Sequence, residues 1–253
     1  MTNRNTPGAS ASRFEAFVDL GPADRALLAS FAEASVSLHS GRVLRNQGDP
    51  VDCIYLLEEG WAVDSYDLED GNRQIVKVHL PGDILGAPSL ALEAAGETLT
   101  AVTPVVVRPI PLMALSQIFA RAPRLAAAFF LCAQQERIFL LERLATVGKR
   151  RALPRLAAFL LHIHERLAAS NSGYTSFASL PLTQTDIGEI LGLTAVHVNR
   201  TFRELDATGM IRRGQGWIEF VDVPALRVLS GMPEHRWVRN PAWILSLSEG
   251  SSR

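Results

Sequence analysis

The sequence contains only two cysteines, Cys53 and Cys132, among its 253 residues. Two thiols cannot supply the four ligands of a cysteine-bound iron–sulfur cluster or a framework of disulfides. We expect both to be small buried residues in a reducing cytosol. The longest apolar runs also fall short of the ~20 residues that span a membrane, and the polar N-terminus lacks the apolar stretch of a signal peptide. Together these absences predict a cytoplasmic protein.

Motifs for catalysis are absent as well. The sequence has no glycine-rich phosphate loop, no nucleophile elbow and no acidic pair that suggests catalysis. His162 and His164 are two residues apart on a predicted helix and cannot chelate one ion together. His79, in a predicted strand, is the remaining candidate ligand, although an ordinary core histidine is the simpler interpretation. We therefore predict that the protein is not an enzyme and has no metal site and no cofactor.

The net charge is too small to indicate a partner by itself. Apolar residues make up 47% of the chain and charged residues 20%, with a formal net charge of −1, a composition typical of a globular protein with a buried core. Residues 1–148 carry 12 basic and 17 acidic side chains, whereas residues 149–230 carry 10 and 7, a net charge of +3. This asymmetry hints that the second region faces nucleic acid.

The region 36–112 has the pattern of a small antiparallel β-structure. Short apolar runs alternate with glycines at positions 41, 48, 60, 71 and 82, and each glycine ends a run of about strand length. This pattern predicts a sandwich or barrel. The segment Glu69–Asn72 predicts a hairpin turn, because its glycine accepts the positive φ that such turns require.

Helical patterns flank this region. Residues 14–34 have apolar residues at helical spacing, with a second helix start at Pro22. Residues 123–147 have no glycine or proline after Pro123 and are apolar on almost every side. Such a helix must be covered on more than one face, and the identical helix of a second chain is the economical partner. A fully buried helix in a monomer is the alternative.

The segment 182–213 carries the most informative pattern. Thr183 is a predicted N-cap with Asp186 three residues later, Gly192 lies in a short turn, and Thr194 is a second N-cap. We expect Gly188 where a second helix crosses closely. The second helix, residues 195–207, has an apolar face formed by Val198, Phe202 and Leu205. Its other face carries Ala195, His197, Asn199, Arg200 and Arg203. The following RRGQGWIEF predicts a hairpin with two glycines in its turn, so the whole is typical of a winged helix-turn-helix.

This segment resembles the DNA-binding domain of the Crp/Fnr transcription regulators. The resemblance rests on LTQTDIGEILGLTAVHVNRTFREL followed by GMIRR. GRVLRNQGD, IYLLEEGW and LPGDILG resemble the family's cyclic-nucleotide-binding-type β-roll, and the helix at about 123–147 resembles its dimerisation helix. Covering about residues 14–225, the resemblance implies an α+β fold. The N-terminal antiparallel, jelly-roll-like β-roll would be followed by a long dimerisation helix and a C-terminal winged helix-turn-helix.

These patterns divide the chain into five predicted parts. They are a disordered tail (1–13), a β-roll sensor domain (14–115), a dimerisation helix (116–148), a winged helix-turn-helix domain (149–228) and a C-terminal tail (229–253). We expect a homodimer that reads a near-palindromic DNA operator and contacts RNA polymerase. The alternative is a ligand-binding regulatory module that acts on a partner protein, which would leave the basic helix as a solvated face.

The resemblance also assigns roles to residues of the two domains. Base-reading positions near the start of the second helix fall on Val196, Asn199 and Arg200; an asparagine suits an adenine edge and an arginine suits guanine. Donors expected to bind phosphates are Thr183, Gln184, Thr194, His197 and Arg203. The expected dimer contacts are Phe129, Cys132, Glu136 and Phe139.

The expected effector pocket departs from the family's pattern. Nucleotide-binding members carry a Gly-Glu pair, whose Glu takes the ribose hydroxyl, and an Arg-Ser or Arg-Thr pair, whose Arg takes the cyclic phosphate. Here Gly86 is followed by Ala87, and the later pair is Leu99-Thr100, so both charged anchors are missing. Oxygen-sensing members need a cysteine cluster, which this chain also lacks. We therefore expect a signal other than cAMP. The pocket positions are Gly82, Gly86, Ala87, Leu99, Thr100, Leu140 and Leu141.

Overall fold

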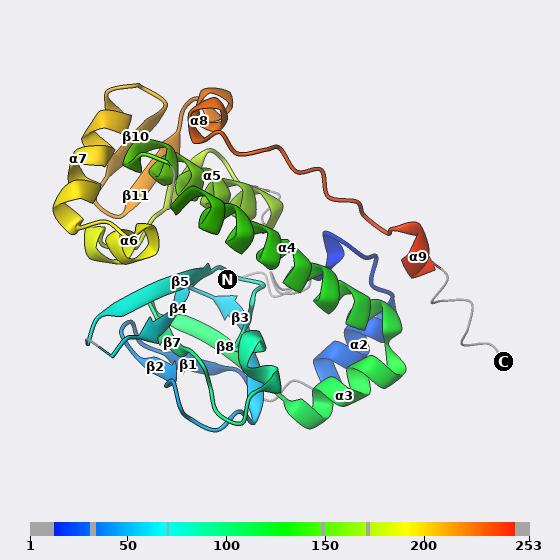
Figure 1. The fold of residues 1–253 in the computed structure, drawn as a ribbon. Helices are drawn as coiled ribbons and strands as arrows, with labels where there is room; N and C mark the ends of the chain where they lie inside the picture. Colours follow the sequence, from blue (N-terminus) through cyan, green and yellow to red (C-terminus); the bar gives the residue numbers. More distant parts are fainter. Residues whose placement is uncertain (1–12, 31–33, 70, 148–149, 171–172, 246–253) are drawn as a thin grey trace, which may run out of the picture. The chain divides into compact units, whose positions relative to one another are not determined.

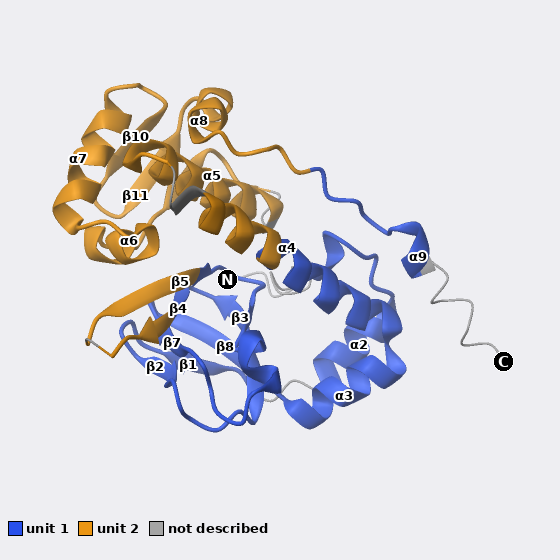
Figure 2. Ribbon diagram, viewed as in Figure 1, with its two compact units in different colours: residues 1–64, 78–136, 236–253 blue, residues 65–77, 137–235 orange. Residues whose placement is uncertain are grey.

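The computed structural model describes residues 13–30, 34–69, 71–147, 150–170 and 173–245 (Figure 1). The predicted disordered tail, apart from Arg13, lies outside these residues, as do Gly148 and Lys149 at the predicted start of the C-terminal domain. The chain forms two compact units (Figure 2). Unit 1 contains the chain up to Asp64, Val78–Glu136 and the chain from Arg236; unit 2 contains Ser65–Lys77 and Arg137–His235.

Two four-stranded sheets form the β-roll, as the sequence predicts. Their strand orders are β1-β8-β3-β6 and β2-β7-β4-β5, and the pairs of the first sheet are antiparallel. The strands are β1 (Val36–Leu38), β2 (Val43–Arg45), β3 (Cys53–Glu59), β4 (Ala62–Asp67), β5 (Arg73–His79), β6 (Ile84–Leu85), β7 (Thr98–Ala101) and β8 (Val105–Pro111). The short strand β6 and the 3-10 helix η1 (Ala87–Ala91) were not predicted, because two apolar residues carry no detectable period.

The β-roll has an apolar core built from both sheets. Leu57, Leu85 and Val107 of the first sheet form one cluster with Leu99 and Ala101 of the second, each at most 1% exposed. Successive side chains of a strand point to opposite faces of its sheet, and these residues occupy inward-facing positions. Burial of this kind is the main source of the unit's stability.

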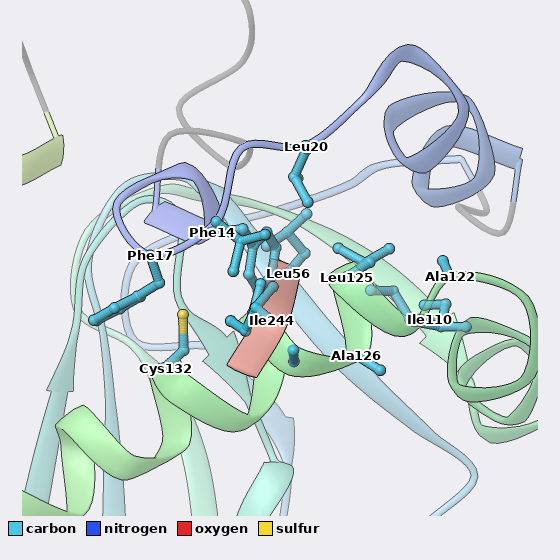
Figure 3. Packing of buried hydrophobic residues seen from close by; sticks show 14 of the residues in the cluster. Phe14, Phe17, Leu20, Leu56, Ile110, Ala122, Leu125, Ala126, Cys132 and Ile244 are labelled. Carbon is cyan, nitrogen blue, oxygen red and sulfur yellow. The ribbon is translucent and has the colours of Figure 1, made fainter. Parts of the chain in front are cut away.

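Three helices accompany the β-roll: α2 (Pro22–Ser30), α3 (Leu112–Arg121) and α4 (Pro123–Val147). The predicted helix start at Pro22 and the predicted long helix at 123–147 are confirmed. Helix α3 ends at Arg121, because Ala122 precedes Pro123 and a residue before proline disfavours helical dihedrals. A second apolar cluster contains Phe14 near the N-terminus, Ile110 of β8 and Leu125 of α4 (Figure 3). None of the helices within the described ranges is long and apolar enough to cross a membrane.

The described part of unit 2 contains the end of α4, residues of β4 and β5, further helices and a three-stranded sheet of order β10-β11-β9. The elements that lie wholly within unit 2 are α5 (Ala152–Ser170), β9 (Phe177–Ser179), α6 (Gln184–Leu191), α7 (Ala195–Asp206), β10 (Ile211–Gly214), β11 (Trp217–Phe220) and α8 (Val223–Ser230). Leu156, Leu160 and Ile163 of α5 are fully buried, together with Leu226 of α8. The predicted β10–β11 hairpin is confirmed. Strand β9 and helix α8 were not predicted, since each is short.

Candidate nucleic-acid interface

Helix α6 begins and ends with the capping groups that the sequence predicts. The Thr183 hydroxyl accepts a hydrogen bond from the Asp186 amide at 3.1 Å, and the Asp186 carboxylate accepts one from the Thr183 amide at 2.9 Å. This reciprocal pair is a capping box and satisfies two amides at the helix start. At the other end, Gly192 has a φ of +62°, which glycine adopts without strain.

Gly188 makes the α6–α7 turn possible. A Cβ atom at this position would lie 2.5 Å from the carbonyl oxygen of Leu193, closer than any side chain tolerates. The predicted close approach at Gly188 is therefore confirmed, although its partner is the turn rather than the body of the second helix. The turn can fold back against α6 only because residue 188 has no side chain.

Helix α7 is capped by Thr194, whose hydroxyl oxygen accepts from the His197 amide at 3.2 Å. Val198, Phe202 and Leu205 are buried at 0–3% exposure, which confirms the predicted apolar face. The spacing i, i+4, i+7 places these residues on one stripe of the helix. The opposite face of α7 therefore remains exposed.

The three predicted base-reading residues lie on the first two turns of this exposed face. Val196 is 82% exposed, and Asn199 is half-buried. The Arg200 side chain is 69% exposed, and its Nε lies 3.8 Å from Oε1 of Glu204, which is itself 54% exposed. An exposed pair at this distance contributes little to stability, so Arg200 can exchange this partner for another at small cost.

The predicted phosphate-binding residues differ in how far their donors are already used. The Thr183 hydroxyl donates to Oδ2 of Asp186 at 2.6 Å. The Thr194 hydroxyl accepts a bond in its cap and keeps its proton for an outside acceptor. Gln184 and Arg203 are exposed, and His197 is half-buried. Arg203 forms no ion pair with another residue of the described chain.

The β10–β11 wing is fastened to α7 by Arg213. Its guanidinium lies 4.4 Å from the centroid of the Phe202 ring, and its Nε lies 2.9 Å from Oδ2 of Asp206. Gly214 lies under the Trp217 ring, where a Cβ would come within 2.2 Å of Nε1. This role of Arg213 could not be predicted from the sequence, because a strand residue that reaches a neighbouring helix leaves no local pattern.

The interior of unit 1 contains a buried ion pair that was also not predicted. Arg45 and Glu97 have side chains 4% and 2% exposed, and Nη2 lies 2.8 Å from Oε1. The Arg45 Nη1 donates to the Cys53 carbonyl at 3.2 Å, and the Ser89 hydroxyl donates to the other oxygen of Glu97. Gly86 borders this pair, since a Cβ there would lie 2.6 Å from Nη2 of Arg45.

His79 belongs to a second buried polar cluster of unit 1. Its Nε2 lies 2.6 Å from Oδ1 of Asp64, and its Nδ1 lies 3.6 Å from Oδ2 of Asp83. Arg13 pairs with Asp83 and also with Glu136 of α4, the latter at 2.8 Å. The ring of His79 therefore lies between two carboxylates of the protein itself.

The predicted effector-pocket residues fall in both units. Gly82, Gly86, Ala87, Leu99 and Thr100 belong to unit 1, and Leu140 and Leu141 belong to unit 2. Leu99 is fully buried in the core between the sheets. Leu140 and Leu141 are 48% and 53% exposed on α4. Their assignment to an effector stays a prediction.

The predicted dimer contacts pack against other residues of the same chain, and only Cys132 among them is buried. Phe129 stacks on Phe14 with ring centroids 4.7 Å apart, and Cys132 is 7% exposed in the same cluster. Glu136 pairs with Arg13. The ring centroids of Phe139 and His162 lie 4.0 Å apart. In contrast, Phe130, Leu141 and Leu144 of α4 are 55%, 53% and 72% exposed.

Comparison with known proteins shows the class to which this fold and site belong. A model of the cyclic nucleotide-binding domain matches residues 35–122, and a model of the Crp-like helix-turn-helix domain matches residues 154–229. The two matches cover the β-roll and the helix-turn-helix with its wing. The protein is thus a DNA-binding transcription regulator with a cyclic-nucleotide-binding-type domain, a class of regulators rather than enzymes.

Individual relatives show the family. The transcriptional regulatory protein btr of Bordetella pertussis is 32% identical over 196 residues, which cover 78% of this chain and 81% of that protein. The nitrogen fixation regulation protein FixK of Bradyrhizobium diazoefficiens is 31% identical over 210 residues, 82% of this chain and 87% of that one. The structure of FixK2 from Bradyrhizobium japonicum shares the fold, with a TM-score of 0.70 and 24% identity over 80% of this chain and 99% of that one. The chain belongs to the Crp/Fnr family.

Proposed function

We propose that the protein acts as a homodimer that reads a near-palindromic operator through the major groove. The observation that carries this proposal is the exposed face of α7, where Val196, Asn199 and Arg200 lie on a helix held by the Thr194 cap and a buried apolar stripe. Arg200 would grip O6 and N7 of a guanine, Asn199 would pair an adenine edge, and Val196 would touch a thymine methyl. Two such helices would read half-sites roughly 34 Å apart.

Phosphate contacts would set the position of α7 in the groove. Thr194 keeps a hydroxyl proton, and Arg203 has no ion-pair partner in the described chain, so both can serve an oxygen of the DNA backbone. Gln184 and His197 would add further donors. Thr183 can add only a weaker contact, because its hydroxyl proton is already donated to Asp186.

We base the dimer interface on the exposed residues of α4. Phe130, Leu141 and Leu144 follow one stripe of the helix, at spacings of 11 and 3 residues, and all three are more than half exposed. These spacings match the a and d positions of a coiled coil, which a second copy of the helix would cover. Phe129, Cys132, Glu136 and Phe139 would support this face from within the protomer.

The effector would be a signal other than cAMP. In this chain the buried guanidinium of Arg45 is already neutralised by Glu97 beside Gly86, within the pocket region that the resemblance indicates. A cyclic phosphate placed there would meet the carboxylate of Glu97, and a buried charge without a partner costs several kcal/mol. The regulator itself would work in the cytoplasm, where it meets DNA and RNA polymerase.

Selection of binding sites from random duplex DNA with the purified protein tests this function. The expected product is an inverted repeat that contains one guanine at a fixed position in each half-site. Leu141→Asp should give monomers in light scattering and lose operator binding, whereas Met113→Asp, which charges a 75% exposed residue of α3, should change neither. A dimer that persists in Leu141→Asp contradicts the interface, and micromolar cAMP binding in calorimetry contradicts the effector assignment.

A further inference from the structure

The C-terminal segment after α8 makes defined contacts with unit 1, although it lies beyond the matched helix-turn-helix domain, which ends at residue 229. The chain passes from unit 2 to unit 1 between His235 and Arg236, as the change of colour in Figure 2 shows. Residues 236–245 then include the short helix α9 (Ala242–Leu245). We call residues 236–245 the C-terminal strap.

Asn240 is the polar anchor of the strap. Its amide donates to the Phe17 carbonyl at 2.8 Å, and its side-chain oxygen accepts from the Asp19 amide at 2.9 Å. Its side-chain nitrogen donates to the Asp19 carboxylate. Asn240 also has a φ of +47°, a conformation that asparagine tolerates better than most side chains. These three hydrogen bonds to Phe17 and Asp19 fix the position of Asn240.

Charged residues of the strap and of α4 add to the contacts of Asn240 with Asp19. Arg239 lies 2.5 Å from the carboxylate of Asp19, and Arg124 of α4 donates to the Asp19 carbonyl at 3.1 Å. The hydrogen bond from Asn240 and the charges of Arg239 and Arg124 together lower the pKa of Asp19. Asp19 is therefore held as a carboxylate by the strap and by α4 together.

Apolar contacts hold the end of the strap. Ile244 is fully buried in the cluster that contains Phe14, Leu56 and Cys132 (Figure 3). Trp237 meets the ring of Phe17 edge-on, with centroids 5.9 Å apart. Burial of an apolar side chain stabilises the state in which it is removed from water, so the burial of Ile244 favours the docked state of the strap.

We propose that the C-terminal strap restrains the DNA-binding unit by anchoring its C-terminal end on unit 1. The segment Arg137–His235, which forms unit 2 together with Ser65–Lys77, is then attached to unit 1 through α4 at one end and through the strap at the other. A chain anchored at both ends has fewer orientations than one anchored at a single end. The restraint pre-organises the unit and lowers the entropy that binding must overcome.

The consequence for DNA rests on the proposed function, because a dimer that grips two half-sites depends on the orientation of both DNA-binding units. Restriction of these orientations raises the effective concentration of the second reading helix at its half-site. The strap should therefore strengthen binding to a full operator and leave binding to a single half-site unchanged. This difference separates a restraint from a general effect on folding.

A site for a specific protease inserted between the exposed residues Pro233 and Glu234 of the full-length protein tests the docking. After cleavage, the fragment that carries the strap should co-elute with the rest of the chain in gel filtration. Asn240→Ala, and separately Ile244→Asp, should release it, whereas the control Val238→Asp, at a residue 66% exposed, should retain it. Release of the fragment from the otherwise unaltered chain would overturn the proposal.

Affinity for DNA tests the restraint. Cleavage, or Asn240→Ala without cleavage, should weaken binding to the full operator by about tenfold and leave the half-site affinity within twofold. Unchanged operator affinity after cleavage would overturn the restraint, even if the fragment stays bound. If the uncleaved, unsubstituted protein binds no DNA, the proposed function is overturned. Co-elution of the strap fragment after cleavage would still report docking in that case. In dimers of two differently tagged chains, a fragment held by the partner chain would contradict anchoring within one chain.

Discussion

The two units of this protein use charged residues in opposite ways. Unit 1 buries Arg45 and Glu97 at 4% and 2% side-chain exposure and encloses His79 between two carboxylates. On the surface of unit 2, Arg200 and Glu204 form a loose pair at 69% and 54% exposure. The same residue types therefore hold a fold together in one unit and face outward in the other.

The physical reason for this difference lies in the cost of losing a partner. A buried charge whose partner is removed remains without compensation, whereas an exposed charge returns to water at almost no cost. Arg200 can therefore leave Glu204 for a base, and Arg203, which has no ion pair within the described residues, can meet a phosphate. Arg45 cannot, because its surroundings are closed by Glu97, the Cys53 carbonyl and Gly86.

Removal of a buried partner should have the largest effect. Glu97→Ala leaves Arg45 buried without its counter-ion, and we expect the free energy of unfolding to fall by about 3–5 kcal/mol. Glu219→Ala, which removes the exposed partner of Arg212 in the wing, should cost less than about 1 kcal/mol. Urea denaturation of both variants measures the difference. Equal losses would contradict the contrast between the units.

A double substitution sharpens the same comparison. Replacement of both partners by apolar residues, Arg45→Met with Glu97→Leu, removes the buried charges together. The double variant should be more stable than Glu97→Ala, because no unpaired charge remains. A double variant less stable than Glu97→Ala would show that the pair is needed for its shape as well as its charge.

The exposed arginines of α7 should have the next largest effects, and these should appear in DNA binding rather than in stability. Arg200→Ala should cost about 1–3 kcal/mol of binding free energy and relax the preference at one symmetric base pair. Arg203→Ala should weaken binding to every sequence about equally and flatten the salt dependence. Competition assays on operators with single-base changes distinguish the two. If the two patterns are exchanged, the assignment of reader and phosphate contact is wrong.

Loss of the α7 cap should have a smaller effect on stability. Thr194→Ala removes the acceptor of the His197 amide and should lower the free energy of unfolding by about 1 kcal/mol. Thr194→Ser keeps the cap and serves as the control. Unfolding curves for the two variants measure the cap. A loss in Thr194→Ser equal to that in Thr194→Ala would show that the methyl group, not the hydroxyl, matters.

The smallest expected effect is a dependence of stability on pH within unit 2. Burial, aided by the charge of Arg227 and opposed by that of Glu165, lowers the pKa of His164, which lies beside Tyr174. As the pH falls below the ordinary histidine value of about 6.5, the unfolded chain binds a proton before the folded one. The free energy of unfolding should therefore decrease in this range until His164 is protonated in the folded state too.

His164→Phe removes this titration while keeping an aromatic ring beside Phe220. Denaturation at pH 7.5 and pH 5.5 should show a smaller difference for this variant than for the unaltered protein. The same difference in both would assign the pH dependence to other groups.

The parts of the molecule that could be predicted from sequence are those determined by neighbours in the chain. Caps such as Thr183 and Thr194 lie within three residues of the amides they bind, and the strand pattern of the β-roll repeats within a few residues. The Arg45–Glu97 pair joins residues 52 apart, and Asn240 binds Asp19 across 221 residues. No local pattern reports such contacts. Helix α4 shows the limit of prediction from local sequence. It is apolar on almost every side, and this pattern does not show that Phe129 stacks on Phe14.

The absence of a side chain at Gly188 has a consequence for the heat of DNA binding. Because α6, its turn and α7 are already packed together in the free protein, they need not fold when DNA arrives. Association should then show a heat-capacity change that matches the apolar area buried at the interface alone, without the larger negative value of coupled folding and binding. Calorimetric titrations at several temperatures would reveal a pre-formed reading surface in this way.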